Sequence, residues 1–212
     1  MSVTTTPKQE IIDTALTEFL NKGIKSFTVK DLTELMGIST KTVYKVVGDK
    51  TNLLRTCLQQ HYSMLHTELS DLASTKKNAL EIVLAMMDVI VKKEFEVNPH
   101  FYRDLNRYYP NLQDEILDNH MEIQTLCVAL IRQGIQEGLI RPDINENLAW
   151  LSLRRLYSGI TRDGIYTAYD FPITDLIRNT IIIFFRGMCT SKGIQMVQKF
   201  DMISQSSLSN GN

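Results

Sequence analysis

The sequence predicts an all-α protein of about nine helices, and three observations lead to this fold class. The 212 residues include only five prolines and ten glycines, so few positions interrupt regular structure. Between these breaks, apolar residues recur at helical spacing over long stretches. The alternation of apolar and polar residues that marks a strand is almost absent. Because 43% of the residues are apolar, the chain can bury a substantial core in one or two domains.

The first helix is expected to begin after Thr6 and to end at Gly23. Thr6 is a good N-cap, Pro7 suits the first helical position, and Gln9 would complete a capping box. Gly23 can adopt the backbone conformation that closes a helix. A single apolar stripe between these ends predicts a buried face, formed by Ile11, Ile12, Ala15, Leu16, Phe19 and Leu20.

Residues 28–55 predict two very short helices joined by a glycine turn, followed at once by a longer helix. Thr28 and Asp31 stand in the capping-box arrangement at the start of the first short helix. Gly37 supplies the permissive backbone that a sharp turn needs, and Ser39 caps the second short helix. This pattern is typical of a helix-turn-helix, whose second helix enters the major groove of DNA.

An ordinary packing unit of an all-α domain would give the same order of helix, turn and helix. The second short helix, however, leaves only Val43 and its end residues Val46 and Val47 for a core. A purely structural helix usually buries a larger share of its surface. The polar residues that remain favour DNA binding: Ser39, Thr40, Lys41, Thr42, Tyr44 and Lys45.

The rest of the chain continues in long helices. Asp49 is a suitable N-cap for a helix over about 50–72. Further helices are expected over 76–96, 98–108, 111–137, 145–168 and 173–191. The end of the chain from residue 204 is poor in apolar side chains, which predicts a disordered tail.

The distribution of charge favours a dimer. The formal net charge of −1 gives no general argument for nucleic-acid binding. Residues 1–55 carry eight Lys and Arg against six acidic residues, whereas the remainder carries fifteen against eighteen. A monomer with so few spare cations would bind phosphate weakly, and a dimer presents two copies.

Several other functional classes lack their motifs. No histidine pair has metal-ligand spacing among His61, His66, His100 and His120, and neither a Gly-rich phosphate loop nor a nucleophile elbow occurs. We therefore expect no enzyme activity, no metal and no cofactor. Three widely spaced cysteines predict buried thiols, namely Cys57, Cys127 and Cys189. Without a signal peptide or an apolar stretch of transmembrane length, a soluble cytoplasmic protein with no membrane partner is expected.

The segment IIDTALTEFLNKGIKSFTVKDLTELMGISTKTVYKVVGDKTNLL resembles the DNA-binding domain of the tetracycline-repressor (TetR) family of bacterial transcription regulators. The likeness covers about 45 residues, and EGLIRPDIN at 137–145 is similar to a connector of the family. The resemblance implies a helix-turn-helix domain over 1–49, an effector-binding and dimerisation domain over 50–203, and a tail over 204–212. Val46 and Val47 depart from the family, which commonly has an aromatic or histidine pair there.

The DNA-contacting residues follow from chemistry and from the resemblance together. By resemblance, Tyr44 and Lys50 contact the DNA backbone, which positions a protein without reading sequence. Lys41 could pair with guanine, and the methyl groups of Thr40 and Thr42 could pack on thymine. The full DNA-binding set is expected to be Thr28, Lys30, Ser39, Thr40, Lys41, Thr42, Tyr44, Lys45 and Lys50.

The last two predicted helices carry more apolar side chains than one core face needs, since residues 181–185 are apolar on all sides. By resemblance, these helices form a four-helix bundle with a twofold mate. A helix central to its own monomer is the alternative. The expected interface residues are Leu156, Ile160, Ile177, Ile181, Phe184 and Phe185.

The helices between the two ends are rich in methionine and polar-tipped aromatic residues, which suit an apolar pocket with a few orienting groups. The candidate effector-pocket residues are Met64, Met86, Met87, Phe95, Tyr102, Cys127 and Tyr157. For each of them, a plain core position is the stronger interpretation.

The sequence thus predicts a ligand-responsive transcriptional regulator, by default a repressor. It is expected to bind a pseudo-palindromic double-stranded DNA operator as a homodimer and to be released by a small, largely apolar effector. The alternative is a helix-turn-helix protein that acts through a protein partner or by organising DNA, without a small-molecule effector.

Overall fold

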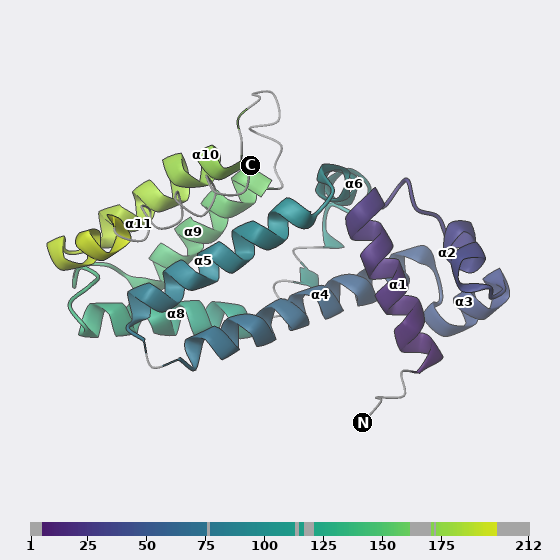
Figure 1. Cartoon of the computed structure of the whole chain (residues 1–212), viewed down its shortest axis with the longest axis horizontal. Coiled ribbons are helices and arrows are strands. Elements are labelled where there is room, and N and C mark those ends of the chain that lie inside the picture. Colours follow the sequence, from purple (N-terminus) through teal and green to yellow (C-terminus); the bar gives the residue numbers. More distant parts are fainter. Residues whose placement is uncertain are drawn as a thin grey trace, which may run out of the picture. The chain divides into compact units, whose positions relative to one another are not determined.

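The computed structural model describes residues 6–75, 77–112, 115–116, 121–161, 171 and 173–198. Within these residues the protein is all-α, which confirms the predicted fold class (Figure 1). The only β-type pairing in the described part is an isolated bridge between Ile140 and Cys189. The elements are α1 (Pro7–Lys22), α2 (Val29–Met36), α3 (Thr40–Val47), α4 (Lys50–Ala73), α5 (Ala79–Glu96), α6 (Pro99–Tyr108), α8 (Met121–Gln136), α9 (Glu146–Thr161), α10 (Ile173–Ile177), the π-helical turn η1 (Arg178–Ile182) and α11 (Ile183–Met188).

The second half of the chain differs in detail from the predicted helices. The expected helix over 111–137 falls partly outside the described residues, and its described part is mainly α8. The expected helix over 173–191 is interrupted by η1 and ends at Met188. Residues 191–198 are helical, although we predicted no helix beyond residue 191. The predicted tail over 204–212 lies outside the described residues.

The chain divides into two compact units. The first consists of residues 1–67 and 93–121, and the second of residues 68–92 and 122–212. The chain passes from one unit to the other within α4 and returns within α5. Most of α4 therefore belongs to the same compact unit as α1, α2 and α3, as does α6. The boundary that we predicted at residue 49, between a DNA-binding domain and an effector-binding and dimerisation domain, stays a prediction.

The core of the first unit is the apolar stripe of α1, surrounded by α2, α3, α4 and α6. Five of its six predicted stripe residues are buried, and the sixth, Leu20, is half-buried. Phe19 packs edge to face against Phe27, with the ring centroids 5.7 Å apart. Phe101 and Leu105 place the buried face of α6 in the same core. This one core holds the helix-turn-helix in place.

The predicted start and end of α1 are confirmed at Thr6 and Gly23, but one half of the capping box is not formed. The Thr6 hydroxyl accepts the Gln9 backbone N–H at 3.3 Å. The Gln9 side chain does not return to Thr6. It donates to the Asp13 carboxylate at 2.9 Å and to the Gln60 side-chain carbonyl at 2.6 Å, which ties α1 to α4.

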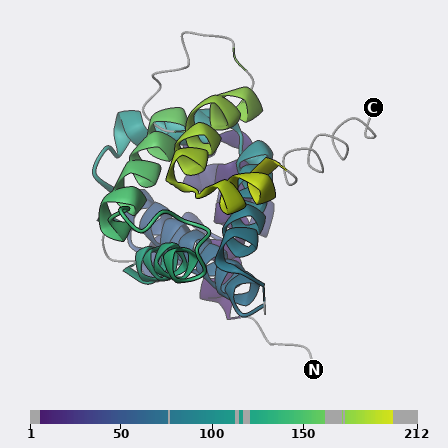
Figure 2. The same ribbon diagram turned by 90° about the vertical axis from the view of Figure 1, so that its left-hand side faces the viewer.

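The second unit is a helical bundle in which α5, α8, α9 and the segment from α10 to α11 lie side by side (Figures 1 and 2). The N-terminus of α5 is tied to the end of α8, because Glu137 accepts the Ala79 backbone N–H at 2.9 Å. The connector after α8 is also fixed. Its Arg141 donates from the backbone to Met188 and from the side chain to the carbonyl oxygen of Gly187, at 2.9 and 3.0 Å.

The π-helical turn η1 explains the apolar run at 181–185. Two side chains bond back to carbonyl oxygens four residues earlier: Asn179 to Asp175 at 2.8 Å and Thr180 to Leu176 at 2.6 Å. The wider turn places several apolar residues on the core face together: Ile177, Ile181, Ile182, Phe185 and Met188. Ile183 points outward and is 58% exposed.

All three cysteines are free thiols, and Cys57 and Cys189 are buried as predicted. Burial raises the pKa of Cys57 and of Cys127 to about 12, and that of Cys189 to about 11. Such thiols carry almost no reactive thiolate at neutral pH. In the described part of the chain, none of the helices combines the length and the apolar character that crossing a membrane requires.

Gly193 is required by close packing in the second unit. A Cβ at Gly193 would overlap the backbone carbonyl oxygen of Leu139, whereas a Cβ at Gly187 would meet nothing within 4 Å. Gly193→Ala should therefore lower the free energy of unfolding by about 1–3 kcal/mol. Gly187→Ala, the matched control within α11, should leave it unchanged or raise it by up to about 1 kcal/mol. Urea titration followed by circular dichroism measures both, and equal effects would contradict this packing.

Candidate nucleic-acid interface

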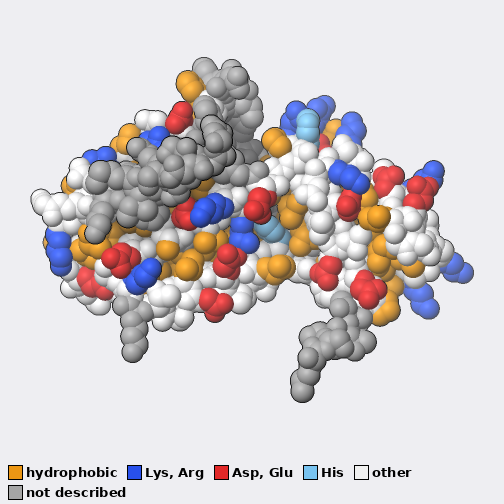
Figure 3. All heavy atoms as spheres, viewed as in Figure 1, with side chains coloured by type: hydrophobic (Ala, Val, Ile, Leu, Met, Phe, Trp, Pro, Cys, Tyr) orange, Lys and Arg blue, Asp and Glu red, His pale blue; other side chains and the backbone are white. Residues whose placement is uncertain are grey.

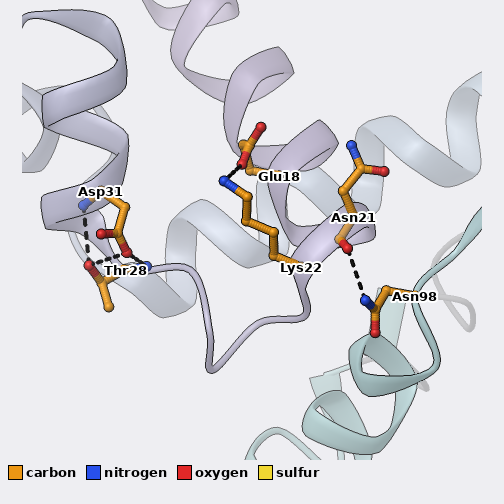
Figure 4. A network of polar contacts seen from close by, with 6 residues as sticks. All are labelled: Glu18, Asn21, Lys22, Thr28, Asp31 and Asn98. Atoms are coloured by element: carbon orange, nitrogen blue, oxygen red, sulfur yellow. Dashed lines mark hydrogen bonds and ion pairs between the residues drawn. The ribbon is translucent and has the colours of Figure 1, made fainter.

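The first helix of the helix-turn-helix, α2, begins with a complete capping box (Figure 4). The Asp31 backbone N–H donates to the Thr28 hydroxyl at 3.2 Å, and the Thr28 backbone N–H donates to the Asp31 carboxylate at 2.7 Å. The Thr28 hydroxyl also donates to that carboxylate at 2.8 Å. These hydrogen bonds lower the pKa of Asp31, because they stabilise its charged form. Thr28, a predicted DNA contact, therefore also fixes the start of α2.

The turn between α2 and α3 depends on the backbone of Gly37. Its φ of 66° lies in the left-handed region, and an added Cβ would meet nothing within 4 Å. The constraint is thus conformational and not steric crowding. After the turn, the Ser39 hydroxyl accepts the Thr42 backbone N–H at 3.1 Å and caps α3.

The exposed surface of α3 matches the prediction. Val43 is its only fully buried residue, and Val46 and Val47 are half-buried against the core. The remaining side chains of α3 are exposed to solvent: Thr40, Lys41, Thr42, Tyr44 and Lys45. The helix therefore presents a polar and basic face that this unit does not use for its own packing.

Hydrogen bonds and charge prepare this face for an anionic partner. The hydroxyl groups of Ser39 and Thr42 are hydrogen-bonded at 2.9 Å, which holds the Thr42 side chain in one place. Neither Lys41 nor Lys45 forms an ion pair with another described residue. Lys30 of α2 lies 3.5 Å from Glu34, and both side chains are so exposed that the pair contributes little. Basic side chains are visible over α2 and α3 in Figure 3, and in these two helices all of them are lysines.

Lys50 differs from the other predicted DNA contacts because its ammonium group is engaged inside the unit. The Nζ atom donates to the carbonyl oxygens of Ile24 and Phe27, at 2.7 and 2.8 Å. It also lies 5.7 Å from the centre of the Phe19 ring. Partial burial lowers the pKa of Lys50, and the nearby Asp104 carboxylate partly opposes this effect. The resemblance assigned Lys50 to a DNA-backbone contact, and sequence reasoning missed these contacts inside the unit.

Two residues of the α6 region, also missed by sequence reasoning, bind the same loop and the last turn of α1 before it. The buried Asp104 accepts the Lys25 backbone N–H at 2.7 Å. Asn98, the N-cap of α6, donates from its backbone to Leu20 at 2.8 Å and from its side chain to Asn21 at 2.9 Å (Figure 4). The sequence feature that could have revealed Asp104 is its position on the apolar face of α6 beside Phe101 and Leu105, where an acidic residue needs a buried partner.

The predicted effector residues are divided between the two compact units. Met64, which is 61% exposed, and the buried Tyr102 belong to the first unit. Met86 is buried in the second unit, where Met87 and Tyr157 pack against its core and Cys127 is half-buried. The side chain of Phe95 lies outside the described residues. The seven residues therefore do not gather within one unit.

Four of the six predicted interface residues lie in the core of their own protomer. Ile160, Ile177, Ile181 and Phe185 are buried in the second unit, and Phe185 is fully inaccessible. In the single chain these four side chains leave little surface for a second chain, so their assignment to a dimer interface stays a prediction that this burial does not favour. Leu156 and Phe184 are half-buried. The exposed apolar side chains of α9 and α11 are Leu148, Leu151 and Ile183.

The chain is similar in sequence to proteins that regulate transcription, although no protein-family model matches it. It is 23% identical over 153 residues to the HTH-type transcriptional repressor KstR2 of Mycobacterium tuberculosis, a match that covers 68% of this chain and 74% of the relative.

Solved structures of TetR-family regulators have the same fold. A TetR-family regulator from Shewanella sp. PV-4 superposes with a TM-score of 0.59 at 18% identity, over 88% of this chain and 100% of that one. The ketosteroid transcriptional regulator KstR2 of M. tuberculosis gives a TM-score of 0.54 at 19% identity, over 89% and 98%. The resemblance predicted from the N-terminal residues is confirmed.

Proposed function

We propose that this chain is a tetracycline-repressor (TetR) family regulator that represses transcription by binding an operator as a dimer and is released by a small, largely apolar effector. The observation that carries DNA binding is the surface of α3, which buries Val43 alone and exposes a row of Thr, Lys and Tyr side chains. An eight-residue helix with so little buried surface is built to contact another molecule. Its relatives in sequence include a transcriptional repressor, which supports repression rather than activation. A repressor of this kind acts in the cytoplasm and needs no catalytic residue.

Within α3 we assign two kinds of DNA contact. Thr40 and Lys41 lie at the N-terminal end of the helix, which is the part of a recognition helix that reaches base edges. Tyr44, which is 45% exposed, and Lys45 lie one turn further on and suit the phosphate backbone. A twofold dimer places two such helices roughly 34–36 Å apart, so the operator should be a pseudo-palindrome.

DNA selected from a random library by the purified protein should contain two inverted half-sites. Lys41→Ala should change the base preference at one position by about 1–3 kcal/mol. Tyr44→Phe should weaken binding to all sequences about equally, because it removes a phosphate donor. Fluorescence anisotropy with the selected operator and its point variants measures both. Lys92→Ala, an exposed lysine of α5 paired with Asp88, is the control and should bind like the wild type.

Failure of the wild-type protein to select any DNA would refute the proposed function. A Lys41→Ala variant that lost affinity equally for every operator variant would refute only the division into base and phosphate contacts.

We further propose that α9 and α11 form the dimer interface through their exposed apolar side chains. Leu148 and Leu151 lie three residues apart on one face of α9 and are 64% and 47% exposed, and Ile183 of α11 is exposed as well. Apolar surface of this kind is better buried against a second copy than left in water.

The wild-type protein should sediment as a dimer at micromolar concentration, and Leu151→Glu should shift it toward the monomer because a buried carboxylate would oppose association. Leu35→Glu is the matched control, since Leu35 is 59% exposed but lies on α2. Analytical ultracentrifugation distinguishes the two variants. A monomeric wild-type protein, or equal behaviour of both variants, would contradict the interface.

For the effector we propose a site in the second unit. Met87 and Tyr157 pack there as half-buried side chains of α5 and α9. The indole N–H of Trp150 is buried and donates to no acceptor among the described residues, and a buried donor of this kind has a strong preference for a partner. The relative KstR2 is named for ketosteroids, which are largely apolar molecules with a polar oxygen. An effector of similar character suits these residues.

An effector releases the operator only if it binds the DNA-free conformation more tightly than the DNA-bound one. We expect an apolar ketone or carboxylic acid, found by thermal-shift screening of a steroid and fatty-acid panel, to weaken operator binding. Trp150→Phe should make the binding free energy of that ligand less favourable by about 0.5–1.5 kcal/mol. It should leave the affinity of the ligand-free protein for the operator unchanged. Operator affinity that a stabilising ligand does not change would instead favour the alternative of a regulator without a small effector.

A further inference from the structure

Lys50 stands where the resemblance implies a phosphate contact, yet the structure gives its ammonium group a different environment. An ammonium group has three N–H donors, and two of them are used by the carbonyl oxygens of Ile24 and Phe27 at 2.7 and 2.8 Å. The Phe19 ring lies against the same group. A lysine that turned outward to a phosphate would leave both carbonyl groups without this donor.

The loop that these bonds fix leads directly into the helix-turn-helix. Phe27 immediately precedes Thr28, the N-cap of α2, and its ring packs in the core against Phe19. The buried Asp104 of α6 binds the same loop and accepts the Lys25 backbone N–H at 2.7 Å. One cation and one anion from two helices therefore satisfy three backbone groups within the short segment 24–27.

We propose that Lys50 is a positioning residue for DNA binding, which fixes the loop before α2, and with it the α2–α3 pair, and makes no phosphate contact. This inference rests on the proposed DNA-binding function. The entry point of α2 determines where α3 lies, because α2 and α3 pack on each other. Loss of the Lys50 bonds should loosen that placement and weaken specific binding, which requires a defined orientation of α3 in the groove.

The salt dependence of DNA binding separates positioning from phosphate contact. Each phosphate neutralised by the protein adds about −0.9 to the slope of log K against log salt concentration, so removing one lysine–phosphate pair from each protomer of a dimer should make the slope shallower by about 1.8. Lys50→Met keeps the length of the side chain and removes its charge and donors. We expect this variant to keep the wild-type slope, to lose about tenfold or more in operator affinity, and to bind scrambled DNA like the wild type.

Lys45→Met is the matched control, because Lys45 is an exposed lysine of α3 without an ion-pair partner among the described residues. It should make the slope shallower and weaken operator and scrambled DNA alike. Lys50→Arg gives a second measurement if Lys50→Met does not fold: it retains the cation, but a planar guanidinium does not reproduce the two short bonds of an ammonium group. A positioning role predicts weaker operator binding at an unchanged slope for this variant too.

A slope that becomes shallower in Lys50→Met as it does in Lys45→Met would overturn the inference, as would wild-type operator affinity in Lys50→Met or in Lys50→Arg. These outcomes all require a wild-type protein that binds its operator. A wild-type protein that binds no DNA would instead refute the proposed function, so the two failures are distinguishable.

Discussion

The first unit depends on how the backbone of the segment between α1 and α2 finds its hydrogen-bond partners. Buried backbone groups without partners are costly, and helix ends leave several of them. Here the partners come from helices distant in sequence. Lys50 of α4 and Asp104 of α6 bind the segment itself, and Asn98, the N-cap of α6, binds the last turn of α1. These bonds connect three helices that already share an apolar core. The helix-turn-helix is therefore part of a larger packed unit, and its orientation is set by residues that do not belong to it.

This arrangement accounts for the small share of the core that α3 itself provides. An isolated helix of eight residues is unstable in water, so α3 needs support from elsewhere. The support comes from the Ser39 cap at one end, the Gly48 turn at the other, and Val43 in between. Because the surrounding unit supplies most of the stability, the outward residues are free to be chosen for their contacts with a partner. Such an arrangement suits recognition, since the exposed residues of α3 can be substituted without loss of the fold.

Sequence patterns predicted what depends on neighbouring residues and missed what depends on distant ones. The caps at Thr6, Thr28 and Ser39, the turn at Gly37 and the buried stripe of α1 follow from spacing alone, and the structure has them all. Lys50 could not be assigned from its neighbours, because its acceptors lie 23 and 26 residues away. For residues 181–185 the sequence left a dimer interface and the core of the chain's own monomer as alternatives, because regular helical spacing does not anticipate a π-helical turn. The DNA contacts, the dimer interface and the effector site remain predictions, since each requires a second molecule.

The π-helical turn at Arg178–Ile182 has a consequence for how this protein can change by insertion and deletion. A π-turn holds one residue more than the α-helical turn it replaces, so losing a single residue there could restore a regular helix without breaking the chain's hydrogen bonding. Because the wider turn absorbs the extra residue, Ile183 and Phe185 would then keep their present outward and inward orientations. In a regular α-helix, by contrast, a one-codon deletion rotates every later residue by about 100° around the helix axis. Relatives that lack this residue can therefore present the same face of α11 to solvent although their C-terminal helix is one residue shorter.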